Sequence, residues 1–358
     1  MSANGPVSII PPERVAAVDA AADSLATGGM AIVTGPAGDG HEGVFVQAAQ
    51  HVTAEDLRFL GATAGGLTTV AVPAERLADL RIRAMADRAE ADDLGTPTMH
   101  VGVNHRSRST GGVSFRDRAA TVRALADSSS VAGDFVQPGH VFPLAYTAGG
   151  VLRRPGHTEA ALDLVRIAGL GDAAALCDIA RADGEMADFD ELADLAATHG
   201  IPLVRTADVV LHRLRHEASV ERVAEAVLPL PQGTFVAVGY RERDSAREHM
   251  ALVLGSVHGA GDVAVHLHAE CLWGDVFRSN ACGCAADLDA AMAHVSSLGR
   301  GVIVYLAAPE ARAPSAAMGH RPGELDDEVG AQILRDLGVV SARGLVSLSD
   351  PGVRTHHG

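Results

Sequence analysis

Short apolar runs alternate with amphipathic stretches along the first half of the chain. Residues 30–34 and 67–72 are rich in apolar and β-branched side chains and predict buried strands. Apolar positions recur at helical spacing in several longer segments, which predict helices over residues 9–28, 74–91, 159–168 and 185–200. Strands that alternate with helices in this way indicate an α+β (mixed α/β) fold.

The second half also alternates predicted strands with helices, and it contains more strands. Strands are predicted over residues 233–240, 250–254, 263–268 and 302–306, and a helix over residues 288–298. The alternation within 263–268 places His266 and His268 on one face of its strand. Between the halves lies a basic, histidine-bearing segment, residues 212–216, that we expect to lead into a short helix. We therefore expect two domains, residues 8–217 and residues 218–358.

Composition narrows the class of protein. A hydrophobic fraction of 47% with 21% charged residues is typical of a globular chain with a full core. The formal net charge of −16 argues against nucleic-acid binding, which needs a basic surface. All 29 basic residues are arginine, which excludes a Schiff-base lysine. No apolar run is long enough to predict a membrane span, and the few cysteines favour the cytoplasm.

Three of the 4 cysteines crowd into one segment near the C-terminus. Cys282 and Cys284 flank one glycine, and Cys271 can reach the same point through a loop. Three thiolates suit Zn²⁺ and leave a fourth position for water, whose pKa the metal lowers toward neutrality. The alternatives are a buried cysteine cluster without metal, or a structural site with a nearby histidine as fourth ligand.

Longer motifs in both halves resemble a known pair of enzyme domains. The second half resembles GTP cyclohydrolase II through HAECLWGDVF at 268–277, CGC at 282–284, GRGVIVYL at 299–306 and GAQILRDLG at 330–338. The first half resembles 3,4-dihydroxy-2-butanone 4-phosphate synthase through VSFRDR at 113–118, DFVQPGHVFPL at 134–144, GGVLRRPGHTEA at 149–160 and DGEM at 183–186. Together the halves are similar to the bifunctional riboflavin-biosynthesis family.

The resemblance implies roles for particular residues. In the first half His157 corresponds to a metal-binding histidine for Mg²⁺ or Mn²⁺, with Glu42 and Asp178 as the acid/base carboxylates. Substrate-binding positions are implied at Arg154, Thr158, His140 and Asp117 of the first half and at His268 and Glu270 of the second. It further implies zinc at Cys271, Cys282 and Cys284, a small phosphate or nucleotide substrate, and a homodimer.

The chain also departs from the family pattern at both sites. In the acidic loop, Gly40 stands for a metal-binding glutamate and Val44 for an aspartate, and Asp178 replaces a glutamate. In the second half, the family's segment with a catalytic tyrosine is largely missing before Gly330, residues 325–328 contain no arginine, and the domain looks truncated. These losses concern groups that bind the metal, hold the substrate or take part in catalysis in the family.

Three functions are compatible with this pattern. The first is a working bifunctional riboflavin enzyme with both activities. The second, which we favour, is a diverged, zinc-binding enzyme with eroded sites that acts on a sugar phosphate or purine nucleotide related to ribulose 5-phosphate or GTP. The third is a non-catalytic structural or regulatory paralogue that keeps the fold.

Overall fold

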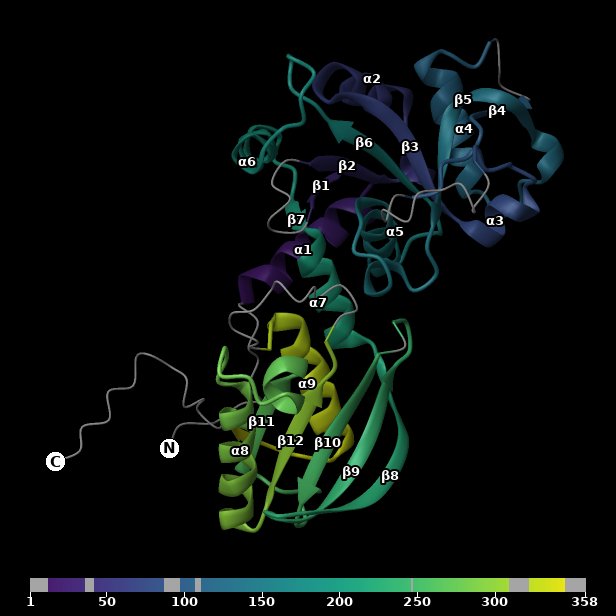
Figure 1. Ribbon diagram of the computed structural model, residues 1–358. Coiled ribbons are helices and arrows are strands. Elements are labelled where there is room, and N and C mark those ends of the chain that lie inside the picture. Colours follow the sequence, from purple (N-terminus) through teal and green to yellow (C-terminus); the bar gives the residue numbers. More distant parts are fainter. Residues whose placement is uncertain are drawn as a thin grey trace. The chain divides into compact units, whose positions relative to one another are not determined.

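The chain divides into two compact units in a computed structural model (Figure 1). One unit spans Pro11–Arg213 and the other begins at Leu214; we refer to them as the first and second units. None of the helices within the described residues is long and apolar enough to cross a membrane. The structure describes residues 12–35, 42–86, 97–106, 111–245, 247–308 and 322–344.

The first unit is built on a seven-stranded sheet with the order β4-β5-β3-β6-β2-β1-β7. Its strands are β1 (Ala31–Thr34), β2 (Gly43–Ala48), β3 (Gly65–Pro73), β4 (Val103–His105), β5 (Phe135–Tyr146), β6 (Ala174–Ile179) and β7 (Leu203–Arg205). Every residue of β1 and β2 is buried, as expected of strands that are covered on both faces. The register places Val44 of β2 opposite Asp178 of β6, so the start of β2 lies beside the end of β6.

Helices cover both faces of this sheet. The helices of this unit are α1 (Pro12–Ala26), α2 (Ala54–Thr63), α3 (Ala74–Asp79), α4 (Phe115–Ala126), α5 (His157–Ile167) and α6 (Phe189–His199). Helix α7 (Thr206–His216) begins in this unit and crosses the boundary at Leu214. Buried side chains of α2, α4 and α6 form one apolar core with alternate residues of the strands, such as Ile32 and Phe45. On the other face, α5 packs against β1, β2, β3 and β6, with α1 beside it.

Helix α5 is buried on almost every side, and it contains two carboxylates one turn apart. Glu159 is 0% exposed and Asp163 2% exposed. Asp163 accepts hydrogen bonds from the Tyr146 hydroxyl at 2.7 Å and the Val151 amide at 2.9 Å, and it pairs with Arg213 at 2.9 Å. Buried carboxylates are stable only when they are paired in this way. The two carboxylates therefore fix the position of α5, and with it the position of His157 at its N-terminus.

The second unit has a six-stranded sheet with the order β13-β11-β12-β10-β9-β8. Its strands are β8 (Val220–Leu230), β9 (Gly233–Glu242), β10 (Glu248–Leu254), β11 (Val263–Ala269), β12 (Gly301–Leu306) and β13 (Ala342–Gly344). Helix α8 (Cys284–Leu298) packs through Ala291, Met292 and Val295 on the face that carries Ala264 and Ile303. Helix α9 (Glu324–Asp336) lies on the opposite face, where Gly330 approaches Leu267. The alternation of β11 thus turns His266 and His268 toward the α8 face.

Three predicted helices differ from the structure. The helix expected over residues 74–91 ends at Asp79, because Arg81 has a left-handed backbone with φ of 53° that a helix cannot continue through. The helix expected from residue 185 begins at Phe189, after Asp188 caps it by accepting from the Glu191 amide. The short helix expected after residue 216 is instead strand β8, in which valines recur between charged residues.

Candidate active sites

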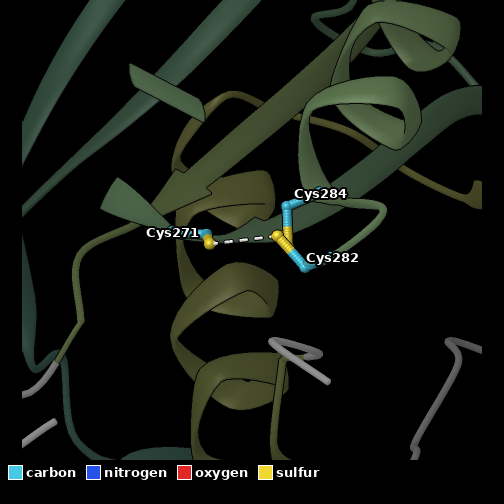
Figure 2. Close-up of side chains that lie close together, drawn as sticks. All are labelled: Cys271, Cys282 and Cys284. Atoms are coloured by element: carbon cyan, nitrogen blue, oxygen red, sulfur yellow. Dashed lines mark hydrogen bonds between the residues drawn. The ribbon is translucent and has the colours of Figure 1, made fainter. Parts of the chain in front are cut away.

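The three cysteines near the C-terminus converge as the sequence predicts (Figure 2). Cys271 follows β11, Cys282 lies in the next loop, and Cys284 is the first residue of α8. The Sγ atoms of Cys271 and Cys282 are 3.7 Å apart, and all three Sγ atoms lie within 4.8 Å of one another. Sulfurs bound to one tetrahedral Zn²⁺ at roughly 2.3 Å are separated by about 3.8 Å. The donor set and its spacing therefore fit zinc.

The short π-helical turn Leu272–Val276 holds this cluster together from one side. Its Gly274 amide donates to the Cys271 sulfur at 3.2 Å, which holds that sulfur against the turn. A Cβ atom on Gly274 would stand 2.9 Å from the Cys282 sulfur and 3.3 Å from the Cys271 sulfur. Only glycine therefore leaves the sulfurs room to meet at this point.

Asp275 connects the cluster to the sheet. Its carboxylate accepts from the Cys271 amide at 2.9 Å and the Tyr305 hydroxyl at 2.8 Å, and lies 3.0 Å from Nε2 of His268. Burial opposes ionisation of Asp275, but the hydrogen bonds from His268, Cys271 and Tyr305 outweigh it and lower its pKa. Since an ionised Asp275 can only accept, Nε2 of His268 carries a hydrogen and donates a hydrogen bond to the carboxylate. Sequence reasoning missed both Asp275 and Tyr305.

The thiols differ in how readily they ionise. The Cys284 amide lowers the pKa of the Cys282 thiol by donating toward its sulfur, whereas burial and then the neighbouring sulfurs raise the pKa of Cys284. All three sulfurs can therefore become thiolates together only when a cation offsets their mutual repulsion, so metal binding would release protons.

The remaining predicted residues of the second unit lie close by. His266 and His268 have ring centroids 5.7 Å apart, which confirms that they share a face. His266 is buried, and its Nε2 has no hydrogen-bond partner in the described part of the chain. Burial, and then the neighbouring His268, lowers the pKa of His266 to about 4. The Glu270 carboxylate accepts from the Ala308 amide at 2.9 Å, which holds it where β11 and β12 end.

In the first unit, the predicted residues His157, Glu42 and Asp178 gather where β2 begins and β6 ends. His157 is the first residue of α5, and its Nε2 is buried without a hydrogen-bond partner among the described residues. Burial lowers the pKa of His157, while the carboxylates of Glu42 and Asp178 act in the opposite direction. The imidazole is therefore neutral near pH 7, which is the state that binds a metal or accepts a proton.

The pKa of the Asp178 carboxyl group is raised, whereas that of His157 is lowered. The surrounding protein raises its pKa although the side chain still reaches solvent, and Glu42 adds to the increase while His157 opposes it. A carboxyl group with a raised pKa and a neutral imidazole nearby are suited to moving protons. These three residues do not form a compact metal-ligand set, since the cysteines are the one group of three with such spacing in the described residues.

Arg154 and Thr158 lie next to this group. The Arg154 guanidinium pairs with the fully buried Glu159 at 2.8 Å, and Glu159 also accepts from the Thr147 amide at 3.0 Å. Thr158, the second residue of α5, is 3% exposed. The Arg154 side chain is 17% exposed. Its pair with Glu159 therefore fixes the guanidinium on its buried side and leaves the remainder accessible to solvent.

His140 and Asp117 are placed in other elements. His140 lies on β5, where its amide donates to the Asn104 side chain at 2.9 Å. Asp117 is buried in the first turn of α4, where its amide donates to Ser114. Their roles in substrate binding stay predictions. Sequence reasoning missed Asn104, which no motif singles out.

Comparison with known proteins identifies the family of the chain. The model of 3,4-dihydroxy-2-butanone 4-phosphate synthase matches residues 19–212, and the model of GTP cyclohydrolase II matches residues 221–348. The riboflavin biosynthesis protein RibBA of Mycobacterium tuberculosis is 39% identical over 361 residues, which cover 93% of this chain and 84% of that protein. The chain belongs to this bifunctional riboflavin-biosynthesis family.

Other relatives agree with this assignment. RibBA of Mycobacterium ulcerans is also 39% identical, with the same coverage. Among solved structures, RibBX from A. baumannii, a two-domain 3,4-dihydroxy-2-butanone 4-phosphate synthase, has a TM-score of 0.75 with 32% identity and covers 92% of this chain. It shares 93% of its own length with the chain. A 3,4-dihydroxy-2-butanone 4-phosphate synthase with two magnesium ions matches 55% of the chain and 95% of its own length, with a TM-score of 0.52 and 29% identity. The family is an enzyme family, and the α+β fold with two family domains is confirmed.

Proposed function

We propose that this chain is a diverged riboflavin-pathway enzyme whose second unit binds zinc through Cys271, Cys282 and Cys284 and hydrolyses a purine nucleotide. The convergence of three sulfurs at the spacing of a zinc tetrahedron supports this more than any other observation. Zinc bound there would supply a water molecule of lowered pKa as nucleophile.

The protein groups around the cluster would serve orientation and proton transfer. Asp275 fixes the ring of His268 through Nε2, which leaves Nδ1 as the nitrogen that can exchange a proton with the substrate. Burial, and then Asp275, raises the pKa of Tyr305, so its hydroxyl remains protonated and keeps donating to Asp275. Glu270, the residue before Cys271, adds a carboxylate that would accept from a nucleobase amino group.

The first unit carries a second candidate activity, proton transfer on a small phosphorylated ketose. The supporting observation is the buried, unpartnered Nε2 of His157, near the carboxylates of Glu42 and Asp178. His157, Glu42 and Asp178 do not share metal-ligand spacing, so Mg²⁺ or Mn²⁺ at His157 would need other oxygen ligands, and the proposed proton transfer uses the neutral imidazole and the carboxyl groups themselves. Arg154, held by Glu159, offers a bidentate contact to the phosphate.

Substitutions in this site favour divergence over the ordinary synthase reaction. Val44, opposite Asp178, replaces a carboxylate of the family with a side chain that moves no protons. Asp39, Gly40 and His41 of the acidic loop lie outside the described residues. We therefore expect the first unit to abstract a proton from a ketose phosphate more readily than it completes the release of formate.

Each activity has its own test. Purified protein is analysed for zinc and incubated with GTP, and separately with ribulose 5-phosphate and Mg²⁺ in heavy water; formate and deuterium incorporation are measured. We expect about one equivalent of zinc, turnover of GTP or a related nucleotide that Cys282→Ser abolishes, and deuterium uptake that His157→Asn abolishes. Each variant is the control for the other unit.

Other outcomes would change the assignment. Protein without zinc and without turnover of either substrate would favour the non-catalytic paralogue. Rapid formate release from both substrates would favour the ordinary bifunctional enzyme. The proposed homodimer is measured by sedimentation, and the proposed cytoplasmic location by fractionation of cells that produce the chain.

A further inference from the structure

The chain that leaves β12 holds Glu270 at two points. The Glu270 amide donates to the Leu306 carbonyl at 2.8 Å, and the Glu270 carboxylate accepts from the Ala308 amide at 2.9 Å. Glu270 is partly exposed, so a ligand can reach it. The direction in which its carboxylate points therefore depends on the course of the chain from Leu306 to Ala308.

Ala307, between these two residues, is held by two side chains from another part of the sheet. Its amide donates to Nδ1 of His249 on β10 at 3.1 Å, and its carbonyl accepts from the Arg247 guanidinium at 3.4 Å. The His249 side chain is fully buried. Both polar groups of the Ala307 backbone are thus engaged, and the residue cannot rotate without breaking a hydrogen bond.

Glu242, the last residue of β9, fixes both of these side chains. Its carboxylate lies 2.5 Å from the Arg247 guanidinium and 3.0 Å from Nε2 of His249. Since Nδ1 of His249 accepts from an amide, Nε2 carries the hydrogen and donates a hydrogen bond to Glu242. Burial opposes ionisation, but hydrogen bonds, first those from His249 and Arg247, outweigh it and lower the pKa of Glu242 to about 2. The three side chains therefore keep the same charges and the same geometry near neutral pH.

We propose that His249 and Arg247 are positioning residues for the Glu270 carboxylate. They hold Ala307, and the residues on either side of Ala307 hold Glu270, so the buried group determines where a substrate meets that carboxylate. Neither side chain needs to touch the substrate. This inference rests on the proposed function of the second unit, in which Glu270 accepts from a nucleobase amino group.

Two substitutions of His249 separate positioning from simple packing. His249→Phe keeps a ring of similar size but removes both nitrogens, so the Ala307 amide loses its acceptor. His249→Asn leaves a smaller side chain but keeps an acceptor at the place of Nδ1. Positioning predicts that His249→Phe is the more harmful change, whereas a purely structural role predicts that His249→Asn is, because it leaves the larger cavity.

Tyr240→Phe is the matched control. Tyr240 is fully buried, lies opposite His249 in the register of β9 and β10, and donates to Asp336 of α9 at 2.7 Å. The substitution thus removes a hydrogen bond that leads to α9 and not to Ala307. It should cost stability without changing how Glu270 is held.

Steady-state turnover of GTP by the zinc-loaded full-length protein is the first measurement. Losing a contact that is equally strong in the ground state and the transition state raises KM and leaves kcat unchanged. Because a displacement of about 1 Å can cost about 100-fold, we expect His249→Phe to raise KM about 10- to 100-fold, with a smaller increase in His249→Asn and none in Tyr240→Phe. When Glu270→Ala is already present, His249→Phe should have no further effect on KM.

Amide hydrogen exchange, followed by NMR, tests the same link without any substrate. The Ala307 and Ala308 amides are both hydrogen-bonded, so they should exchange slowly in the parent chain. His249→Phe should accelerate exchange at Ala308 about 10-fold or more, although that amide donates to Glu270 and not to His249. Tyr240→Phe should not do so beyond its effect on the other amides of the sheet.

The results that would overturn the inference differ from those that would overturn the proposed function. An unchanged KM in His249→Phe, or the same increase with and without Glu270→Ala, would show that His249 does not act through Glu270. Unchanged exchange at Ala308 in His249→Phe would show the same in a protein that turns over no nucleotide. Absence of GTP turnover in the parent chain, together with faster Ala308 exchange in His249→Phe, would remove the proposed function and leave the positioning of Glu270 in place.

Discussion

Replacing Gly274 by alanine is a direct test of the cysteine geometry. The added Cβ would stand 2.9 Å from both the Cys282 sulfur and the Cys284 Cβ, which is 0.5 Å inside the 3.4 Å (3.4 − 2.9) at which ordinary contact begins. The backbone of Gly274 is not left-handed, so alanine adds no strain in φ. The effect of the substitution is therefore steric and confined to the cluster.

The magnitude follows from what the sulfurs can tolerate. Overpacking by one methyl group costs about 1–3 kcal/mol when the neighbours cannot move. Metal–sulfur distances vary by only about 0.2 Å, so the sulfurs can relax in the metal-free protein but not around bound zinc. The cost then falls on the metal-bound state, and we expect zinc affinity to decrease about 5- to 150-fold.

Zinc affinity is measured by competition with a chromophoric chelator. Gly344→Ala is the matched control, because it lies in the same unit, has no left-handed backbone, and has no atom of the described residues within 4 Å of the new methyl group. It should bind zinc as the parent chain does. If Gly274→Ala and Gly344→Ala bind zinc equally well, the sulfurs do not converge beside Gly274 and the zinc site is wrong.

Three further predictions concern charge and metal. Because the pKa of His266 is about 4 when folded against 6.5 as its ordinary value, the unfolded chain binds more protons between these values, and stability falls as pH drops through that window. His266→Gln should remove up to about 3 kcal/mol of this loss. The free energy of unfolding is measured in urea by Trp273 fluorescence at several pH values. If the variant and the parent chain show the same pH dependence, the reasoning is wrong. Glu159→Gln should lower the free energy of unfolding of the first unit by about 2–4 kcal/mol, because Arg154 loses its buried partner; a change below about 1 kcal/mol in chemical denaturation would refute this. A strong chelator should lower the melting temperature of the second unit and leave that of the first unchanged in calorimetry, and Cys282→Ser should have the same effect without chelator.

The parts of the site that the sequence predicts are those set by short spacing. Cys282 and Cys284 are two residues apart, and a turn returns Cys271 to them, so their convergence needs little of the tertiary fold. The shared face of His266 and His268 follows from strand alternation alone. Local geometry was enough in both cases.

The parts that the sequence does not predict depend on distant partners. Tyr305 reaches Asp275 because β12 runs parallel to β11 in a register that sets His268 beside Tyr305. Asp163 on the buried helix α5 is stable because Arg213, 50 residues later, pairs with it. A pattern of polar and apolar positions contains no information about such pairings, and it favours an exposed position for a lone carboxylate.

The buried carboxylates of α5 also limit how the first unit can evolve. Sliding this helix by even one residue would separate Asp163 from Tyr146 and Arg213 and leave a charge unpaired in the core. Any variant that keeps this fold therefore keeps His157 in the same place, whichever substrate it binds. New specificity in this unit must come from the connecting segments around the helix, which can change in sequence without disturbing its anchorage.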